Sequence, residues 1–334
     1  MAITVDNAFN EFMKDIVNLD PNITTQARSS RDWLKEKINT FDGIEGFPEL
    51  YNDIDIYYGS FSRRTKIREL DDIDIMIGLN AQCGSYLESF EKIELTVPEA
   101  ATDLFGLCHE NTNKLNSRKV VNKFVSHLKD ISQYENAEIN RRGEAATLKL
   151  KSYAWKFDIV PCFFTKPEFD GRAYYLIPDG VGNWKKTDPR LDGQRISSIN
   201  QKLDGNVLNV IRAMKYWNRR PTMPSMGSYS LECLILDYYA SQDSCLKYID
   251  LEVKDLLVHL ASAIYNTIKD PKNIQGDLNV LSYEEKSKIS SRALRDHDKA
   301  VEAWNKEKAG DHKAAIIKWK EIFGSDFPNY TSLD

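Results

Sequence analysis

The sequence lacks the cysteine and histidine spacings typical of disulfide frameworks and zinc sites. Its five cysteines include no C-x-x-C pair, and its five histidines show no H-E-x-x-H spacing. An odd number of cysteines without paired spacing argues against a disulfide framework and against a cysteine-rich zinc site. We therefore expect the cysteines to be small buried apolar residues. They are Cys83, Cys108, Cys162, Cys233 and Cys245.

Long apolar runs are also missing. The most apolar stretch, 229–240, is interrupted by Glu232 and Asp237, whereas a transmembrane helix needs about 20 predominantly apolar residues. The first residues, MAITVDNAFNEF, lack the basic region and apolar core of a signal peptide. The sequence therefore predicts a cytoplasmic protein with no membrane partner.

There is no excess of basic residues. The 45 Lys and Arg residues are outnumbered by 50 Asp and Glu residues, which gives a formal net charge of −5. Proteins that hold long DNA or RNA usually carry a basic excess, because the phosphate backbone dominates their affinity. The charge balance instead favours small anionic substrates that are held by a few Lys and Arg side chains, and it argues against a DNA template.

The predicted elements run in the order helix, strands, helices. The first forty residues predict two helices, one around 8–17 and a longer one that Pro21 and Thr24 open and that runs to about Phe41. The middle of the chain predicts one helix at 117–129, and strands at 54–58, 71–79, 145–153 and 155–164. The Pro-, Gly- and Asp-rich segment 174–191 predicts a loop with short strand pieces.

From about Ile199 the chain is predicted to be mostly helical. Helices are expected at 205–218, 229–240 and 250–269, with two more between 283 and 323. This order favours an α+β fold with the strands gathered in one lobe and a second lobe made of helices. We place the boundary near residue 195, so that the lobes comprise residues 1–195 and 196–334.

The segment from Gly59 to Asp74 carries the strongest chemical signal. Gly59-Ser60 follows a predicted strand, and a glycine lets backbone N–H groups approach a phosphate while a serine hydroxyl adds a donor. Asp72 and Asp74 alternate with Ile73 and the later isoleucines on the next strand, so both carboxylates lie on one face. Such oxygens suit Mg²⁺, which proteins bind through one or two carboxylates together with substrate phosphates.

A third carboxylate, Asp158, is predicted on a separate strand. Asp72, Asp74 and Asp158 together predict a site for two Mg²⁺ or Mn²⁺ ions with nucleoside triphosphates as substrates. One ion would hold the triphosphate and the pyrophosphate leaving group, while the other would lower the pKa of an attacking ribose hydroxyl. Asp158 is expected to assist as a base, and little else is required because phosphoryl transfer is mainly positioning and charge stabilisation.

These motifs resemble a known family. The pattern G-S-x-x-R-x-T-x-I, then D-I-D and a later F-D-I-V-P, is similar to the DNA-polymerase-β-like nucleotidyltransferases. More narrowly it resembles the bacterial relatives of cyclic GMP-AMP synthase and oligoadenylate synthase, the CD-NTase family. The matching positions are Gly59, Ser60, Arg63, Thr65, Ile67, Asp72, Asp74 and Asp158. The similarity continues through 175–189, 215–217 (KYW), 228–232 (SYSLE) and 313–328, and so covers essentially the whole chain.

The resemblance implies a polymerase-β-like nucleotidyltransferase lobe, a mixed sheet with helices, packed on a C-terminal helical lobe that closes the nucleotide pocket. It implies that Gly59, Ser60, Arg63 and Thr65 belong to the nucleotide-binding segment. It also implies that Lys215 and Ser228 contact the triphosphate and that Tyr229 stacks on a base. A Lys is a compact point charge for phosphate, and aromatic stacking tolerates any base. For Arg63 two expectations stay open: a phosphate contact, or pairing with a local acid such as Glu69.

The expected activity is template-independent synthesis of a cyclic di- or trinucleotide second messenger. By resemblance, it would serve bacterial anti-phage signalling (CBASS), and the product would act on a separate effector protein. An alternative is a nucleotidyltransferase that modifies an RNA end, a protein or a small molecule, although the acidic balance disfavours RNA. A third is a nucleotide-binding module without catalysis, which the retention of all three carboxylates disfavours. The oligomeric state has no signal in the sequence.

Overall fold

The computed structural model describes residues 1–90, 92–221, 224 and 226–332, and the chain divides into two compact units. Residues Asn22–Ser62 and Leu70–Arg190 form one, called here the sheet unit. Residues Met1–Pro21, Arg63–Glu69 and Leu191–Asp334 form the other, called the helical unit. The short segment from Arg63 therefore belongs to a different unit from the Gly59-Ser60 turn that precedes it.

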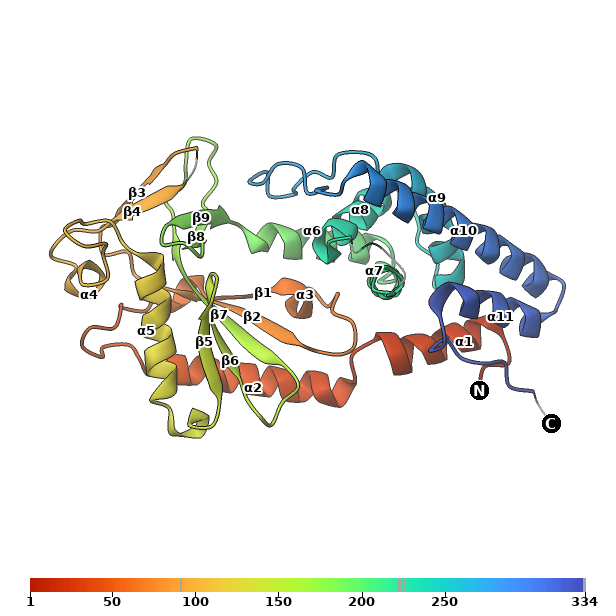
Figure 1. Cartoon of the computed structure of the whole chain (residues 1–334), viewed down its shortest axis with the longest axis horizontal. Coiled ribbons are helices and arrows are strands. Elements are labelled where there is room, and N and C mark those ends of the chain that lie inside the picture. The colour runs from red at the N-terminus through yellow and green to blue at the C-terminus, as the bar shows by residue number, and fades with distance from the viewer. Residues whose placement is uncertain (91, 222–223, 225, 333–334) are drawn as a thin grey trace. The chain divides into compact units, whose positions relative to one another are not determined.

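The sheet unit is built on a mixed nine-stranded sheet (Figure 1). The main path runs β1-β2-β7-β8-β9-β4-β3, and β6 pairs with both β7 and β5. Strands β2 and β7 pair in parallel, while the other pairs are antiparallel. The strands are β1 (Ile56–Tyr58), β2 (Asp72–Gly78), β3 (Ser85–Glu88), β4 (Ile93–Thr96), β5 (Glu138–Arg142), β6 (Ala145–Lys149), β7 (Lys156–Phe164), β8 (Tyr175–Pro178) and β9 (Trp184–Thr187).

The alternation in β2 separates an apolar face from an acidic one. Ile73, Ile75 and Ile77 are buried, with at most 1% of their surface exposed. Asp72 and Asp74 are half-buried on the opposite face. In β7, Phe157 and Ile159 are buried while Asp158 is half-buried between them. Because successive side chains of a strand point to opposite faces, burial of the apolar set directs the aspartates to the other side.

Helices cover the sheet unit. The helix α5 (Ser117–Lys129) packs on β5, β6, β7 and β8 (Figure 1). The Asn116 side chain caps it by accepting from the backbone N–H groups of Arg118 and Lys119, which otherwise lack partners. This unit also contains the long α2 (Pro21–Asn39), except for its first residue, and the single turns α3 (Gly59–Ser62) and α4 (Thr102–Phe105).

The helical unit contains α1 (Val5–Phe12), which continues into a π-helical turn at Met13–Val17. The long helix α10 (Tyr283–Lys308) packs on both α9 (Ile249–Ala263) and α11 (His312–Phe323) (Figure 1). It begins with a capping box between Ser282 and Glu285. The other helices are α6 (Pro189–Lys202), α7 (Val207–Asn218) and α8 (Ser228–Ala240).

Aromatic packing places α1 in the helical unit. The ring of Phe9 lies 4.9 Å from that of Trp319 and 5.1 Å from that of Phe327, and Phe12 lies 5.0 Å from Phe323. Buried aromatic pairs of this kind stabilise a structure beyond the area that they bury. The sequence predicts both N-terminal helices in the lobe of the strands, whereas these contacts join the first helix to the C-terminal end of the chain.

The α+β fold with a mixed sheet and a helical C-terminal region is confirmed. The segment 174–191, expected to be a loop with short strand pieces, contains the short strands β8 and β9 as well as the start of α6. The strand expected at 145–153 ends at Lys149, and the helix expected at 250–269 ends at Ala263. Strands β3, β4 and β5 and the turn α4 were not predicted. Within the described part of the chain, no helix combines the length and apolarity that crossing a membrane requires.

Candidate active site

The two aspartate-bearing strands, β2 and β7, lie side by side. In their parallel register Asp74 is opposite Asp158, and Asp72 is opposite Lys156. Neighbouring strands are about 4.8 Å apart, so the Asp74 and Asp158 side chains stand next to each other on one face, with Asp72 two residues along. The structure therefore brings the three sequence-predicted carboxylates to one patch of the sheet.

Two residues that sequence reasoning missed hold the Asp158 carboxylate. The hydroxyl of Thr147, on β6 directly opposite Asp158, donates a 2.7 Å hydrogen bond to Oδ1. The Lys156 ammonium forms an ion pair with Oδ2. Lys156 stands two residues before Asp158 on the same strand face, a spacing that the sequence displays. The position of Thr147 depends on the antiparallel pairing of β6 with β7, which the spacing alone does not give.

Gly59 lies against the carboxylate of Asp74. Its backbone has φ +73°, a conformation that favours glycine, and a Cβ built there would lie 1.8 Å from Asp74 Oδ2. Both observations require glycine at this position. The turn at Gly59 and the acidic face of β2 are therefore in direct contact, as expected if one phosphate-bearing ligand is to meet both.

Tyr58 lies beside the same carboxylates, and their charge affects the pKa of its phenol. It pairs with Asp74 in the β1–β2 register. Burial, together with the negative charges of Asp74 and Asp158, raises the pKa of the Tyr58 phenol well above its usual value. Tyr58 therefore stays protonated at neutral pH beside this acidic patch.

The donor set suits a hard divalent cation that arrives with its substrate. Three carboxylates on one face offer oxygen ligands of the kind that Mg²⁺ prefers. Among the residues that the structure describes, however, no three His, Cys, Asp or Glu side chains are close enough together to hold a metal ion by themselves. Mg²⁺ characteristically binds through one or two carboxylates plus substrate phosphates, so a site completed by a triphosphate fits this arrangement.

A second polar cluster lies in the helical unit, centred on Glu232 of α8. The Glu232 side chain is 2% exposed. It accepts from Arg63 Nε at 2.7 Å, from Lys215 Nζ at 2.6 Å and from Thr65 Oγ1 at 2.8 Å. The cluster buries two cations against one carboxylate and so carries one net positive charge. Arg63 is thus paired, but with an acid far along the chain rather than with the nearby Glu69.

Charge pairing outweighs burial for Glu232 and Arg63 in this cluster, whereas burial outweighs it for Lys215, whose pKa is lowered. Burial alone would raise the pKa of Glu232, but Arg63 and Lys215 outweigh it and lower that pKa to about 2. Burial would likewise lower the pKa of Arg63, yet the charge of Glu232 raises it. The carboxylate and the guanidinium are therefore both charged at neutral pH.

Lys215, expected to contact a triphosphate, already has protein acceptors. Besides Glu232 it donates to the Thr65 carbonyl at 3.2 Å and to the Thr65 hydroxyl at 3.1 Å, and its side chain is 5% exposed. An ammonium group has three donors, so all of them are used. A direct phosphate contact would have to replace one of these bonds, and the role implied by the resemblance stays a prediction.

Tyr229, expected to stack on a base, is flanked by cations. The Arg63 guanidinium lies 5.6 Å and the Lys272 ammonium 4.4 Å from its ring centroid. The Tyr229 hydroxyl donates to Asp192 at 2.6 Å and accepts from Lys272, which also pairs with Asp270 at 2.8 Å. Burial, then nearby negative charge, raises the pKa of Tyr229 far above its usual value. Ser228, the first residue of α8, is exposed.

The predicted site residues thus fall into two sets. Gly59, Ser60, Asp72, Asp74 and Asp158 belong to the sheet unit. Arg63, Thr65, Lys215, Ser228 and Tyr229 belong to the helical unit. Within the first set the structure joins the glycine turn to the carboxylates; within the second it joins Arg63, Thr65 and Lys215 through Glu232.

Comparison with known proteins decides the family. The chain is 45% identical over 332 residues to the probable cyclic nucleotide synthase of Bacillus cereus strain VD146, covering 99% of both chains. The protein belongs to the bacterial CD-NTase family. A second relative, the cyclic AMP-AMP-AMP synthase of Acinetobacter sp. strain ATCC 27244 / 9458, is 25% identical over 238 residues, which are 69% of this chain and 66% of that protein. No protein-family model matches the chain.

The fold agrees with the CD-NTase assignment. The solved structure of Escherichia coli MS115-1 CdnC with ATP superposes with a TM-score of 0.69 at 16% identity, covering 98% of this chain and 100% of that one. At this identity the likeness shows the fold alone. The full-length relative confirms the expected membership, and the protein is a nucleotidyltransferase enzyme.

Proposed function

We propose that this CD-NTase links nucleoside triphosphates, without a template, into a cyclic di- or trinucleotide second messenger, with Asp72, Asp74 and Asp158 as its catalytic carboxylates. The observation that carries the proposal is the parallel register of β2 and β7, which sets Asp74 opposite Asp158 on the acidic face. The 45% identity to a probable cyclic nucleotide synthase supports the reaction class.

Each linkage is one in-line displacement at phosphorus. A ribose hydroxyl of the acceptor attacks the α-phosphorus of the donor, the bond from that phosphorus to the bridging oxygen breaks, and pyrophosphate leaves. The hydroxyl proton passes to Asp158 or to water. Mg²⁺ or Mn²⁺ held by the three aspartates and the triphosphate oxygens would supply charge neutralisation for the leaving group and a lower pKa for the attacking hydroxyl.

The protein's own residues do the positioning. Thr147 and Lys156 hold Asp158 in one orientation through its two oxygens. Gly59 leaves room for the Asp74 carboxylate and, with Ser60, offers a turn against which a phosphate can rest. Such positioning is most of what an enzyme contributes to phosphoryl transfer.

In the helical unit, Ser228 and Tyr229 are proposed to contact the triphosphate and a base, respectively. The cluster of Arg63, Lys215 and Glu232 adds one net buried positive charge, which favours an anionic ligand in its neighbourhood. This supports a part for Arg63, Thr65 and Lys215 in binding nucleotide.

The biological setting is likewise a proposal. A relative named as a cyclic AMP-AMP-AMP synthase supports a cyclic product. By the family resemblance we propose that the product acts on a separate effector protein in bacterial anti-phage defence, and that the enzyme works in the cytoplasm.

A product assay tests the proposed function. Purified protein is incubated with all four ribonucleoside triphosphates and Mg²⁺ or Mn²⁺, treated with phosphatase, and analysed by mass spectrometry. A phosphatase-resistant product of two or three linked nucleotides is expected, and it should vanish in the Asp72→Ala, Asp74→Ala double variant. A modified RNA end, protein or small molecule in place of such a product would assign the alternative transferase activity and overturn the proposal.

A further inference from the structure

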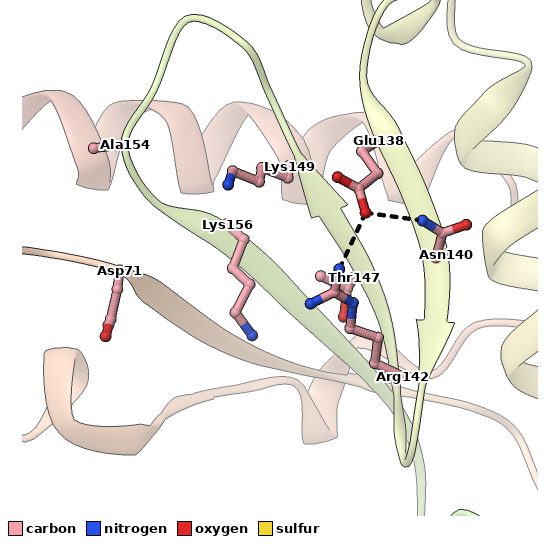
Figure 2. A pocket seen from close by; sticks show the side chains of 8 residues that line it. All are labelled: Asp71, Glu138, Asn140, Arg142, Thr147, Lys149, Ala154 and Lys156. Carbon is pink, nitrogen blue, oxygen red and sulfur yellow. Dashed lines mark hydrogen bonds and ion pairs between the residues drawn. The ribbon is translucent and has the colours of Figure 1, made fainter.

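A pocket of about 270 Å³ lies in the sheet unit, on the strands β5, β6 and β7 (Figure 2). Three cationic side chains from three different strands line it, together with the two acids Glu138 and Asp71 and with uncharged groups between them. The lining residues used below are Arg142, Lys149, Lys156, Glu138, Asn140 and Thr147.

The strand register makes this pocket continuous with the catalytic face. Asn140 is opposite Thr147, which is opposite Asp158. One row further along, Glu138 is opposite Lys149, which is opposite Lys156. Residues directly opposite each other share a face, so the pocket begins beside Asp158 and extends outward over β6 and β5.

One cation of the pocket is uncommitted. Glu138 accepts from Arg142 at 3.0 Å and from the Asn140 amide at 3.2 Å, as the dashed lines in Figure 2 show. Lys156 pairs with Asp158. The exposed side chain of Lys149 has no hydrogen-bond or ion-pair partner among the described residues. With Arg142 and Lys156 nearby, its ammonium is left to bind an anion from solution.

The volume of the pocket and the distance between Lys149 and Asp158 indicate which anion would fit. Pockets for whole small-molecule ligands are roughly 300–1,000 Å³, so this one suits only part of a nucleotide. Lys149 lies one strand and two residues from Asp158, about 8 Å for a strand spacing of ~4.8 Å and a rise of ~3.3 Å per residue. A nucleotide whose reacting ribose hydroxyl lies at Asp158 has its 5′-phosphates on the opposite side of the sugar. The distance between that hydroxyl and the phosphates is similar to the distance between Asp158 and Lys149.

We propose that Lys149, with Arg142 and Lys156, binds the 5′-polyphosphate of the acceptor nucleotide. The proposal rests on the function proposed above, because it takes Asp158 as the point where the acceptor hydroxyl reacts. Binding of the polyphosphate, which is remote from the reacting oxygen, would make a nucleoside triphosphate a better acceptor than a nucleoside. The pocket thereby selects the acceptor, while the neighbouring Asp158 takes part in the reaction itself.

The test separates donor from acceptor. A 2′,3′-dideoxynucleoside triphosphate serves as the donor, because it lacks the hydroxyl groups that an acceptor needs. The acceptor is supplied as a nucleoside, a 5′-monophosphate or a 5′-triphosphate. Donor and acceptor carry the bases that the product assay identifies. Initial rates of linear dinucleotide formation are followed by mass spectrometry for the wild type and Lys149→Gln. The matched control is Lys151→Gln, an exposed lysine just beyond β6 that does not line the pocket.

The expected result is a rise of about tenfold in the KM for the triphosphate acceptor in Lys149→Gln, the size of one lost charge-assisted hydrogen bond. The KM for the nucleoside acceptor should be the same in this variant as in wild type, and Lys151→Gln should match wild type throughout. Equal KM values for the triphosphate acceptor in wild type and Lys149→Gln would overturn the inference while leaving the synthase activity intact.

Two further outcomes would also overturn it. If Lys149→Gln relieves inhibition by added pyrophosphate without changing the acceptor KM, the pocket holds the released product rather than the acceptor. If wild-type protein forms no dinucleotide with any acceptor, while another molecule becomes nucleotidylated, the proposed function fails and this inference fails with it.

Discussion

A methyl group placed on Gly59 would lie 1.8 Å from Oδ2 of Asp74. The side chain of any other residue must therefore displace the carboxylate on which the proposed catalysis depends. We expect Gly59→Ala to lower the rate of product formation at least a hundredfold, because misplacement by about 1 Å is enough for that loss. Product formation under saturating nucleotide measures it.

Gly171→Ala is the matched control for strain. Gly171 has φ +76°, close to the +73° of Gly59, but no heavy atom lies within 4 Å of its built Cβ. Both variants should lose about 1–2 kcal/mol of unfolding free energy from the left-handed backbone, whereas only Gly59→Ala should lose activity. Equal loss of activity in both would show that the contact with Asp74 is irrelevant.

Thr147 orients Asp158 through a single hydrogen bond of 2.7 Å. Replacing it by Val keeps the shape of this buried side chain and removes the hydroxyl. We expect kcat to fall about tenfold, since a hydrogen bond to a charged group contributes about 1.5–3 kcal/mol. Thr147→Ser retains the donor and should restore most of the activity, and urea denaturation shows whether the fold is preserved. A kcat unchanged by Thr147→Val would show that Thr147 has no role in orienting Asp158 for catalysis.

Metal affinity should depend on the nucleotide. The described residues offer no preformed cluster of three ligands, and Mg²⁺ sites of this type are completed by phosphates. Titration calorimetry with Mn²⁺ should therefore show at least tenfold tighter binding when a non-hydrolysable nucleoside triphosphate is present. The Asp72→Ala, Asp74→Ala variant should lose this gain. Tight Mn²⁺ binding by the wild type without nucleotide would contradict the expectation.

The carboxylate patch was largely predictable, because strand alternation is a local property. Asp72, Asp74 and Asp158 each stand on a strand whose apolar residues fix the buried face. What the sequence does not carry is the pairing of strands. The position of Thr147 opposite Asp158, and the pocket around Lys149, require β5 and β6 to form a hairpin next to β7. These partners appear only with the sheet register.

Contacts between residues far apart in the sequence were the second feature that could not be predicted. Arg63 was expected to pair locally with Glu69 or to touch phosphate, yet its ion-pair partner is Glu232, 169 residues away. Likewise the first helix packs on aromatic residues near the end of the chain, such as Trp319. Neither contact leaves a periodic or spacing signal, since both depend on how distant segments come together in the fold.

Glu232 should be important for stability because it neutralises two buried cations. Glu232→Gln leaves Arg63 and Lys215 without their carboxylate, and breaking a buried ion pair on one side costs about 3–5 kcal/mol. The folded-state pKa of Glu232 is lowered to about 2, so its stabilising effect is present above its ordinary pKa and is lost as the pH falls through about 2. Urea unfolding at pH 7 should show the full loss.

A surface pair provides the comparison for Glu232. Glu302 pairs with Lys318 at 2.9 Å, but its side chain is 56% exposed. Glu302→Gln should leave the urea concentration at the unfolding midpoint close to that of wild type, as is usual for exposed ion pairs. If the two variants unfold at the same urea concentration, the buried cluster contributes nothing beyond an ordinary surface pair.

Asp250, the second residue of α9, should destabilise the protein at neutral pH. Burial, with the negative charges of Glu307 and Asp6, raises its pKa from 3.8 to about 6. A folded-state pKa above the unfolded one means that the favourable contribution is present below pH 3.8 and is lost as the pH rises through about 6. Asp250→Asn keeps a neutral side chain at every pH. It should therefore raise the unfolding free energy at pH 7.5 by about 1–3 kcal/mol, and by little at pH 4.

Urea unfolding at pH 4, 5, 6 and 7.5 checks this prediction, with Asp255→Asn as the control on the same helix. The Asp255 side chain is 54% exposed and pairs with Lys254 at the surface. Its substitution should give a small difference from wild type that does not follow the rise around pH 6. A gain for Asp250→Asn that is equal at pH 4 and pH 7.5 would mean that helix propensity or packing, rather than the cost of a buried charge, explains the stabilisation.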